Sequence, residues 1–242
     1  MKDLDKSTFV LIPAYNEEIR IGSVIRGIKE RLPEAYLFVV DDGSKDQTRE
    51  QAAAAGARVV SHPFNMGYGA ALQTGYKCAL EKGYRELVQM DGDGQHDPSY
   101  LDDLLNVIRK GEADIAIGSR FLKATGGEVQ GLAYRAPVFR RWGMGIFGAI
   151  ASRIIGQKVS DPTSGYQAMN RNVLEWTSSE KFPVDYPDAD VIIMLHRAGF
   201  KIREVPVRMY ENPDGKSMHS GWKPIYYVFK MLLSILVTLL RK

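Results

Sequence analysis

Two aspartates on either side of one glycine are the residues of this 242-residue chain with the clearest chemical use. Asp91, Gly92 and Asp93 follow a short apolar run, which predicts that both carboxylates stand at the end of a buried strand. Two carboxylates held this close repel each other, and a divalent cation removes the repulsion. Mg²⁺ and Mn²⁺ prefer oxygen ligands. Mg²⁺ is usually coordinated by one or two protein carboxylates together with water and phosphate oxygens. The pair therefore predicts a site for a cation and a diphosphate, where Gly92 lets a nucleotide approach the backbone.

Polar residues also follow three other strand-like runs. They are residues 13–17 (Pro-Ala-Tyr-Asn-Glu), 41–44 (Asp-Asp-Gly-Ser) and 118–120 (Gly-Ser-Arg). Each of these segments alone is equally typical of an ordinary turn. Their recurrence at four strand ends favours a ligand site, because ligands of parallel sheets bind beyond the carboxyl ends of the strands.

The elements that would position these residues alternate along the chain. Short runs rich in Val and Ile predict strands, and runs with helical apolar spacing predict helices. Strands are expected at residues 8–12, 36–40, 58–61, 86–90, 113–118 and 202–207, and helices at 16–31, 46–55, 66–82 and 98–110. Asp97 before Pro98 is a good start for the last of these helices. The alternation predicts an α/β fold, with a mostly parallel sheet flanked by helices.

The composition excludes several other classes of protein. Hydrophobic residues make up 45% and charged residues 25% of the chain, as in ordinary globular domains. One cysteine cannot form an internal disulfide or a cysteine-based metal site. A net charge of +3 is too small to indicate nucleic-acid binding. The amino-terminal segment does not read as a signal peptide, so no export is expected. Residues 67–72 only approach a dinucleotide fingerprint, which disfavours a nicotinamide enzyme.

Six motifs spread along most of the chain match one enzyme family. They are residues 13–17, 39–44, 65–69, 91–98, 118–120 and 161–165. With these motifs the chain resembles the family 2 glycosyltransferases of the GT-A fold, and within them the dolichol- and polyprenyl-phosphate sugar synthases. The resemblance implies a Rossmann-like GT-A domain over residues 1–221. It also implies an inverting enzyme that moves a sugar from a nucleotide-diphosphate sugar to a polyprenyl phosphate.

The resemblance further implies which residues bind the donor. Asp41 would accept a hydrogen bond from the base, in a nucleotide site formed by Pro13, Tyr15, Glu17, Val39, Asp41, Asp91 and Gly92. Asp91, Asp93 and Gln95 would hold Mg²⁺ or Mn²⁺ with the diphosphate. A cation and a guanidinium both stabilise the charge that develops on a departing nucleoside diphosphate.

Catalytic and acceptor-binding roles are implied in the same way. The catalytic residues would be Asp93, Arg120 and Asp161, with Asp161 as base or orienter; a turn or helix cap before Pro162 is the alternative for Asp161. The acceptor phosphate would meet Arg120, Arg140 and Arg141, and Asp190 would face the acceptor side. Lys216 and His219 are candidates for a lid over the diphosphate, because Asn212 and Met218 stand where relatives often carry basic residues.

The carboxyl-terminal segment predicts contact with a membrane surface. Thirteen of the sixteen residues 225–240 are apolar or aromatic, and the three exceptions share one helical face. A helix from residue 224 to 240 would span about 25 Å, short of the ~30 Å hydrocarbon core. Residues 222–242 are therefore expected to form an amphipathic interfacial helix that attaches the enzyme to the inner face of the membrane. A helix packed on the protein's own core or on a partner subunit is the alternative.

Two other functions stay open from the sequence. One is a family 2 glycosyltransferase that extends a lipid-linked or surface polysaccharide. The other is a noncatalytic membrane scaffold that binds nucleotide sugars, which Asp91 and Asp93 disfavour. A homo-oligomer or a membrane partner protein is compatible with each of them.

Overall fold

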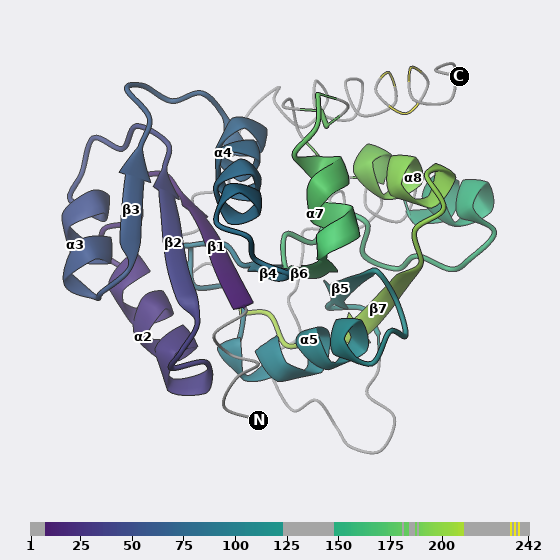
Figure 1. The fold of residues 1–242 in the computed structure, drawn as a ribbon, viewed down its shortest axis with the longest axis horizontal. Coiled ribbons are helices and arrows are strands. Elements are labelled where there is room, and N and C mark those ends of the chain that lie inside the picture. Colours follow the sequence, from purple (N-terminus) through teal and green to yellow (C-terminus); the bar gives the residue numbers. More distant parts are fainter. Residues whose placement is uncertain are drawn as a thin grey trace.

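One sheet of seven strands organises the computed structural model, which describes residues 8–122, 148–180, 182, 183, 187, 189–210, 233, 235 and 237. The strands lie in the order β3-β2-β1-β4-β6-β5-β7, and β6 is antiparallel to both of its neighbours while the other pairs are parallel (Figure 1). Their bounds are β1 Thr8–Ala14, β2 Tyr36–Asp41, β3 Arg58–Ser61, β4 Glu86–Gln89, β5 Ile115–Ser119, β6 Gln167–Asn170 and β7 Ile202–Pro206. The expected α/β fold with a mostly parallel sheet is confirmed.

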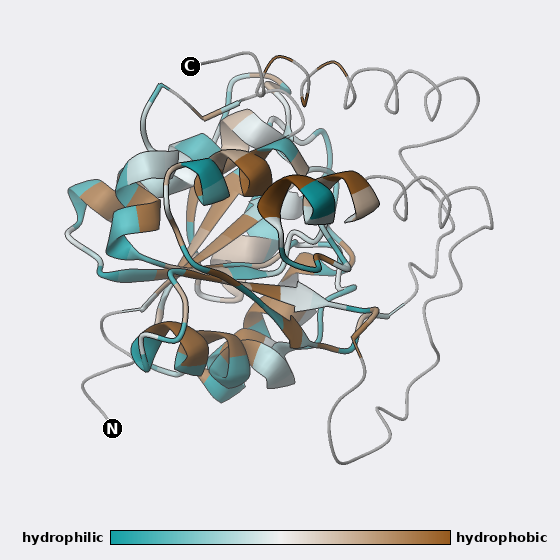
Figure 2. Ribbon diagram, turned by 90° about the vertical axis from the view of Figure 1, so that its right-hand side faces the viewer, coloured by the Kyte–Doolittle hydropathy of each residue, from teal (hydrophilic) through white to brown (hydrophobic). Residues whose placement is uncertain are grey.

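Helices cover both faces of this sheet. Their bounds are α2 Ile21–Arg31, α3 Thr48–Ala54, α4 Tyr68–Glu81, α5 Leu101–Arg109, α7 Arg171–Thr177 and α8 Ala189–Arg197, with a 3-10 turn η1 at Pro98–Tyr100. Alternate residues of a strand point to opposite faces, so Phe9 and Leu11 pack in the cluster with α4, α7 and α8. Val10 and Ile12 pack in the cluster with α2 and α5. Figure 2 shows the apolar sides of both helix layers turned toward the sheet.

Helix α4 lies unusually close to the central strand β1. A Cβ atom at Gly75 would come within 2.1 Å of Cδ1 of Leu11, a side chain that is fully buried. Only a residue without a side chain allows this approach. It places the amino-terminal end of α4, with Tyr68, beside the carboxyl end of the sheet.

The structure corrects two expectations about the elements. Residues 16–20 form turns and not the first turn of a helix, so α2 begins at Ile21. Strand β6 was not expected, because its four residues, Gln-Ala-Met-Asn, carry no β-branched side chain. Asp97 is confirmed as a cap, since its Oδ1 accepts a hydrogen bond of 2.9 Å from the Ser99 amide.

Several predicted features lie outside the described residues. They are Arg140, Arg141, Lys216, His219 and most of the segment 222–242. Within the residues that are described, every helix is too short or too polar to traverse a bilayer. Ile235 is described and buried in the cluster with α4, α7 and α8, whereas Leu233 and Val237 are exposed.

Candidate active site

The predicted site residues gather at one edge of the sheet. Tyr15 and Glu17 follow β1, Asp41 ends β2, Asp91 and Asp93 follow β4, and Arg120 follows β5. Strands β1, β2 and β4 are parallel, and β5 runs in the same direction because β6 is antiparallel to both β4 and β5. The carboxyl ends of these strands therefore lie at the same edge of the sheet. The Gly92 amide donates a hydrogen bond of 3.3 Å to the Pro13 carbonyl, which ties the end of β4 to the end of β1.

Asp91 is a partly buried carboxylate with fixed neighbours. Its Oδ1 accepts a hydrogen bond of 2.9 Å from the Tyr68 hydroxyl, and its Oδ2 lies 3.9 Å from Nε2 of His96. Burial raises the pKa of the Asp91 carboxyl to about 6, although the Tyr68 hydroxyl and the positive charge of Arg120 oppose this shift. The ionised form of Asp91 is therefore costly unless a cation binds there.

Asp93 adds a second carboxylate to the same loop. Its Oδ1 accepts a hydrogen bond of 2.9 Å from the Gln95 amide. Burial raises the pKa of Asp93, and the charge of Asp91 raises it further. Burial likewise raises the pKa of Glu17, which pairs with Arg20 at 3.0 Å and feels the charge of Asp93. Three carboxylates thus crowd this part of the site.

These residues fit a divalent cation. In the part of the chain that the structure describes, no three His, Cys, Asp or Glu side chains form a complete ligand set. A cation that shares its coordination with water and diphosphate oxygens needs only one or two protein carboxylates. Asp91 and Asp93 supply hard oxygen donors. Burial raises the pKa of both carboxyls, and the charge of Asp91 raises the pKa of Asp93 further, so a bound cation would stabilise their ionised forms.

His96 contacts the loop that carries Asp91 and Asp93. The sequence did not single it out as a site residue. Its Nδ1 accepts a hydrogen bond of 3.3 Å from the Asp91 amide, and its ring stacks on Tyr166 with centroids 4.9 Å apart. Burial lowers the pKa of His96 to about 4, so the ring is neutral near neutral pH. A neutral ring can accept the Asp91 amide proton, which fixes the backbone at the start of the loop.

The residues after β7 close the other side of this loop. The Tyr210 amide donates a hydrogen bond of 2.7 Å to the Gln95 carbonyl, and Met209 forms a β-bridge with His96. The Tyr210 hydroxyl donates to Oδ2 of Asp97 at 2.8 Å. The amide and the carbonyl of Gln95 are therefore both hydrogen-bonded, which fixes the backbone of the loop predicted to bind the cation.

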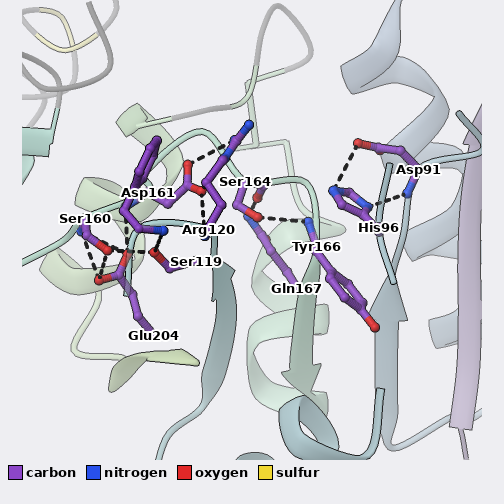
Figure 3. A network of polar contacts seen from close by, with 11 residues as sticks. Asp91, His96, Ser119, Arg120, Ser160, Asp161, Ser164, Tyr166, Gln167 and Glu204 are labelled. Atoms are coloured by element: carbon purple, nitrogen blue, oxygen red, sulfur yellow. Dashed lines mark hydrogen bonds and ion pairs between the residues drawn. The ribbon is translucent and has the colours of Figure 1, made fainter. Parts of the chain in front are cut away.

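Arg120 and Asp161 form a buried ion pair. Nε and Nη2 of Arg120 donate to the two carboxylate oxygens of Asp161 at 2.7 and 3.1 Å, and the Asp161 side chain is fully buried (Figure 3). Glu204 of β7 accepts hydrogen bonds from the amides of Ser160 and Asp161, at 2.9 and 2.7 Å. Because both oxygens of Asp161 accept hydrogen bonds from Arg120, the structure favours Asp161 as the residue that orients Arg120 and not as a base.

Asp190 is fully buried as well, and its Oδ1 accepts a hydrogen bond of 2.9 Å from the amide of Val191.

The structure gives Val39 and Gly92 packing roles. The Val39 side chain is fully buried in the cluster with α2 and α5, so any contact of Val39 with a nucleotide is predicted to involve its backbone. A Cβ atom at Gly92 would lie 3.0 Å from Cδ1 of Ile21 and 3.3 Å from Cβ of Ala14. The missing side chain at Gly92 therefore accommodates protein atoms on that side, and a nucleotide contact at its backbone stays a prediction.

Hydrogen bonds join the loops after β1 and β2. The Asn16 amide donates to Oγ of Ser44 at 2.9 Å, and Oδ1 of Asn16 accepts from the Lys45 amide at 2.9 Å. Asn16 adopts a φ of 57°, a left-handed conformation that Asn tolerates better than most residues. The Glu17 amide donates to Oγ1 of Thr48 at 2.7 Å. The backbone amides of these turns therefore bond to side chains and do not start a helix.

Asp41 and Asp42, at the end of β2, have different hydrogen-bond partners. Oδ1 of Asp41 accepts a hydrogen bond of 3.0 Å from the Ser44 amide. Asp42 accepts from the Met66 and Gly67 amides at 2.9 and 2.8 Å and pairs with Nδ1 of His62 at 2.7 Å. Asp42 thus holds the start of α4 in place, while Asp41 stays with the loop where the nucleoside is predicted.

This fold is that of the GT-A glycosyltransferases. The structure is similar to that of glucosyl-3-phosphoglycerate synthase from Mycobacterium tuberculosis in complex with Mn²⁺ and uridine-diphosphate-glucose. The TM-score is 0.70 at 21% identity, over 98% of this chain and 82% of that one. At this identity the likeness shows the fold.

The sequence comparisons identify the family. A model described as glycosyl transferase family 2 matches residues 9–176, and the chain belongs to this family. The polyprenol monophosphomannose synthase of Mycolicibacterium smegmatis is 33% identical over 227 residues, which cover 88% of this chain and 81% of the relative. The undecaprenyl-phosphate mannosyltransferase of Micrococcus luteus is 31% identical over 220 residues, which cover 87% and 86%. The resemblance to the polyprenyl-phosphate sugar synthases is confirmed.

Proposed function

We propose that this glycosyltransferase transfers a sugar from a nucleoside diphosphate donor to a polyprenyl phosphate, with a divalent cation and with inversion at the anomeric carbon. The relatives named for polyprenol, undecaprenyl phosphate and dolichyl phosphate support the acceptor class. The observation that carries the proposal is the pair Asp91 and Asp93, crowded and partly buried at the end of β4, with Arg120 at the end of β5.

The reaction needs charge stabilisation more than proton transfer. An oxygen of the acceptor phosphate forms a bond to the anomeric carbon, and the bond from that carbon to the donor diphosphate breaks, its electron pair leaving with the nucleoside diphosphate. Asp91, Asp93 and Gln95 would hold Mg²⁺ or Mn²⁺, whose charge neutralises the departing diphosphate. Arg120 adds a positive charge that already acts on Asp91. A phosphate acceptor is ionised near neutral pH, so Asp161 can remain in its ion pair.

The remaining predicted residues complete the proposal. Arg140 and Arg141 join Arg120 at the acceptor phosphate, and Lys216 and His219 act over the diphosphate. Pro13, Tyr15, Glu17 and Asp41 surround the nucleoside. The segment 222–242 attaches the enzyme to the inner face of the membrane, where its exposed Leu233 and Val237 contact lipid.

A transfer assay tests this function. Purified protein is incubated with radiolabelled UDP- or GDP-sugars, polyprenyl phosphate and Mn²⁺, and label is measured in the organic extract. We expect label in the polyprenyl phosphate without any sugar primer, no transfer with EDTA, and a loss of at least about a hundredfold in Asp93→Ala. Asp102→Ala, in the solvent-exposed first turn of α5, is the matched control.

The other candidate functions give different results in the same assay. A requirement for a glycan primer would show an enzyme that extends a lipid-linked or surface polysaccharide. Metal-independent nucleotide-sugar binding with no turnover on any donor would show a noncatalytic scaffold. Either result would contradict the proposed function.

A further inference from the structure

A chain of hydrogen bonds leads from the buried side of α4 to the carboxylate of Asp91. The Tyr76 hydroxyl donates to Oε1 of Gln89, in β4. Nε2 of Gln89 donates to the Tyr68 hydroxyl oxygen and to the Gly165 carbonyl, at 3.0 Å each. The Tyr68 hydroxyl in turn donates to Oδ1 of Asp91 at 2.9 Å.

The direction of every bond in this chain is fixed by chemistry. A carbonyl oxygen only accepts, so the Gly165 carbonyl requires the amide nitrogen of Gln89 and not its oxygen. The same nitrogen then faces the Tyr68 oxygen as a donor. Tyr68 has one hydroxyl proton, and it is directed to Asp91. Tyr76 and Gln89 are 2% exposed each, so water does not compete with the hydrogen bond between them.

Gly165 restricts the same carboxylate from another side. A Cβ atom at this position would come within 2.7 Å of both Oδ2 of Asp91 and the Tyr68 hydroxyl oxygen. Any side chain at Gly165 would therefore displace one of the two groups. The backbone at Gly165 and the hydroxyl of Tyr68 together leave Asp91 little rotational freedom.

We propose that Tyr68 is a positioning residue that orients the Asp91 carboxylate for cation binding, with Gln89 setting the direction of its hydroxyl. This inference rests on the proposed function of Asp91 as a metal ligand. A carboxylate that is oriented in advance loses less conformational freedom when the cation binds, and partners of this kind typically change metal affinity by 10- to 100-fold.

Mn²⁺ binding to Tyr68→Phe tests the inference without measuring activity. Free Mn²⁺ is followed by electron paramagnetic resonance in the presence of UDP or GDP. We expect the dissociation constant for Mn²⁺ to rise about tenfold, with a melting temperature close to that of the wild type. Tyr84→Phe is the matched control, because the Tyr84 ring packs on Phe9 and Tyr36 near the opposite end of the sheet. This control should bind Mn²⁺ as the wild type does.

Gly165→Ala is a second variant that displaces Asp91 by a different route. We expect the same weakening of Mn²⁺ binding, and this variant carries the test if Tyr68→Phe does not fold. In the transfer assay, both variants should need about tenfold more Mn²⁺ for half-maximal rate, while kcat at saturating Mn²⁺ stays within about threefold of the wild type.

Two results would overturn the inference while leaving the proposed function intact. One is wild-type Mn²⁺ affinity in the folded variants. The other is a loss of kcat that saturating Mn²⁺ does not restore, which would make Tyr68 a catalytic residue. A wild-type chain that binds no Mn²⁺ in the presence of either nucleotide would overturn the metal site and this inference together.

Discussion

The buried pair of Arg120 and Asp161 limits what Asp161 can do. A base needs an oxygen that can take a proton, whereas both oxygens of Asp161 accept hydrogen bonds from one guanidinium. Asp161 therefore holds Arg120 in a fixed direction at the end of β5. We therefore expect Asp161 to affect catalysis through the position of the arginine.

Removing the charge of Asp161 should be costly. Asp161→Asn removes the carboxylate charge that pairs with the guanidinium of Arg120, a side chain that is 10% exposed. We expect the free energy of unfolding to fall by about 3 kcal/mol, measured by urea denaturation, together with a large drop in kcat. Glu175→Gln is the control, because the pair of Glu175 and Arg171 is half exposed and should contribute less than about 0.5 kcal/mol. Equal losses in the two variants would show that the buried pair of Arg120 and Asp161 contributes no more than an exposed ion pair.

The raised pKa of Asp91 makes cation binding depend on pH. Below its pKa of about 6 the carboxyl holds a proton that Mn²⁺ must displace, and above it the full repulsion with Asp93 is present. Mn²⁺ should therefore raise the melting temperature more at about pH 7.5 than at about pH 5. Differential scanning calorimetry checks this, with Ca²⁺-free buffers and EDTA as the reference. The same stabilisation at both pH values would rule out Asp91 as the ligand.

The sequence predicts the residues that directly follow a strand, because strand ends can be located from local pattern alone. Asp91, Asp93 and Arg120 belong to this group. Tyr68, Gln89 and Glu204 do not, since their importance comes from hydrogen bonds to residues far along the chain. His96 lies within a recognised motif, but only its stacking on Tyr166 and its bond to the Asp91 amide reveal its role.

At the scale of elements, the parallel strands and the main helices follow from apolar periodicity. Strand β6 does not, because a strand of four residues held between β4 and β5 gains its stability from both neighbours and not from its own residue types. Residues 16–20 are predicted to form the first turn of the following helix, yet the amides of residues 16–18 bond to Ser44, Thr48 and Asp46. Tertiary hydrogen bonds overrule the local pattern there.

The close contact of α4 with β1 gives a stability prediction. Gly75→Ala places a methyl group on the fully buried Leu11, and we expect the free energy of unfolding to fall by about 1–3 kcal/mol. Gly22→Ala, in α2, is the control, because its Cβ would meet only the flexible Arg26 side chain at 3.4 Å. The control should stabilise the protein by up to about 1 kcal/mol. Stabilisation by Gly75→Ala would show that α4 can move away from the sheet.

At the scale of the whole molecule, the carboxyl-terminal segment combines two kinds of apolar residue. Ile235 is 4% exposed within the protein core, whereas Leu233 and Val237 are 48% and 46% exposed. Both the core-packed and the membrane-facing hypotheses therefore have a residue that fits them. One helix can satisfy both when its opposite faces contact the protein and the lipid.

Vesicle binding separates the two contacts. The double variant Leu233→Ser and Val237→Ser should bind vesicles that contain anionic lipid about tenfold more weakly, with an unchanged melting temperature. Val60→Ser, which alters an exposed apolar residue of the edge strand β3, should bind them normally. Cosedimentation measures both. Undiminished binding of the double variant would show that the exposed residues serve another surface.

The most direct measurement is the position of manganese in a crystal grown with Mn²⁺ and a nucleoside diphosphate. Anomalous scattering at the manganese edge locates the ion without reference to the protein. We expect a peak within about 2.0–2.3 Å of carboxylate oxygens from the loop of Asp91 and Asp93, next to the diphosphate. A bound nucleotide with no manganese peak at these carboxylates would contradict this expectation.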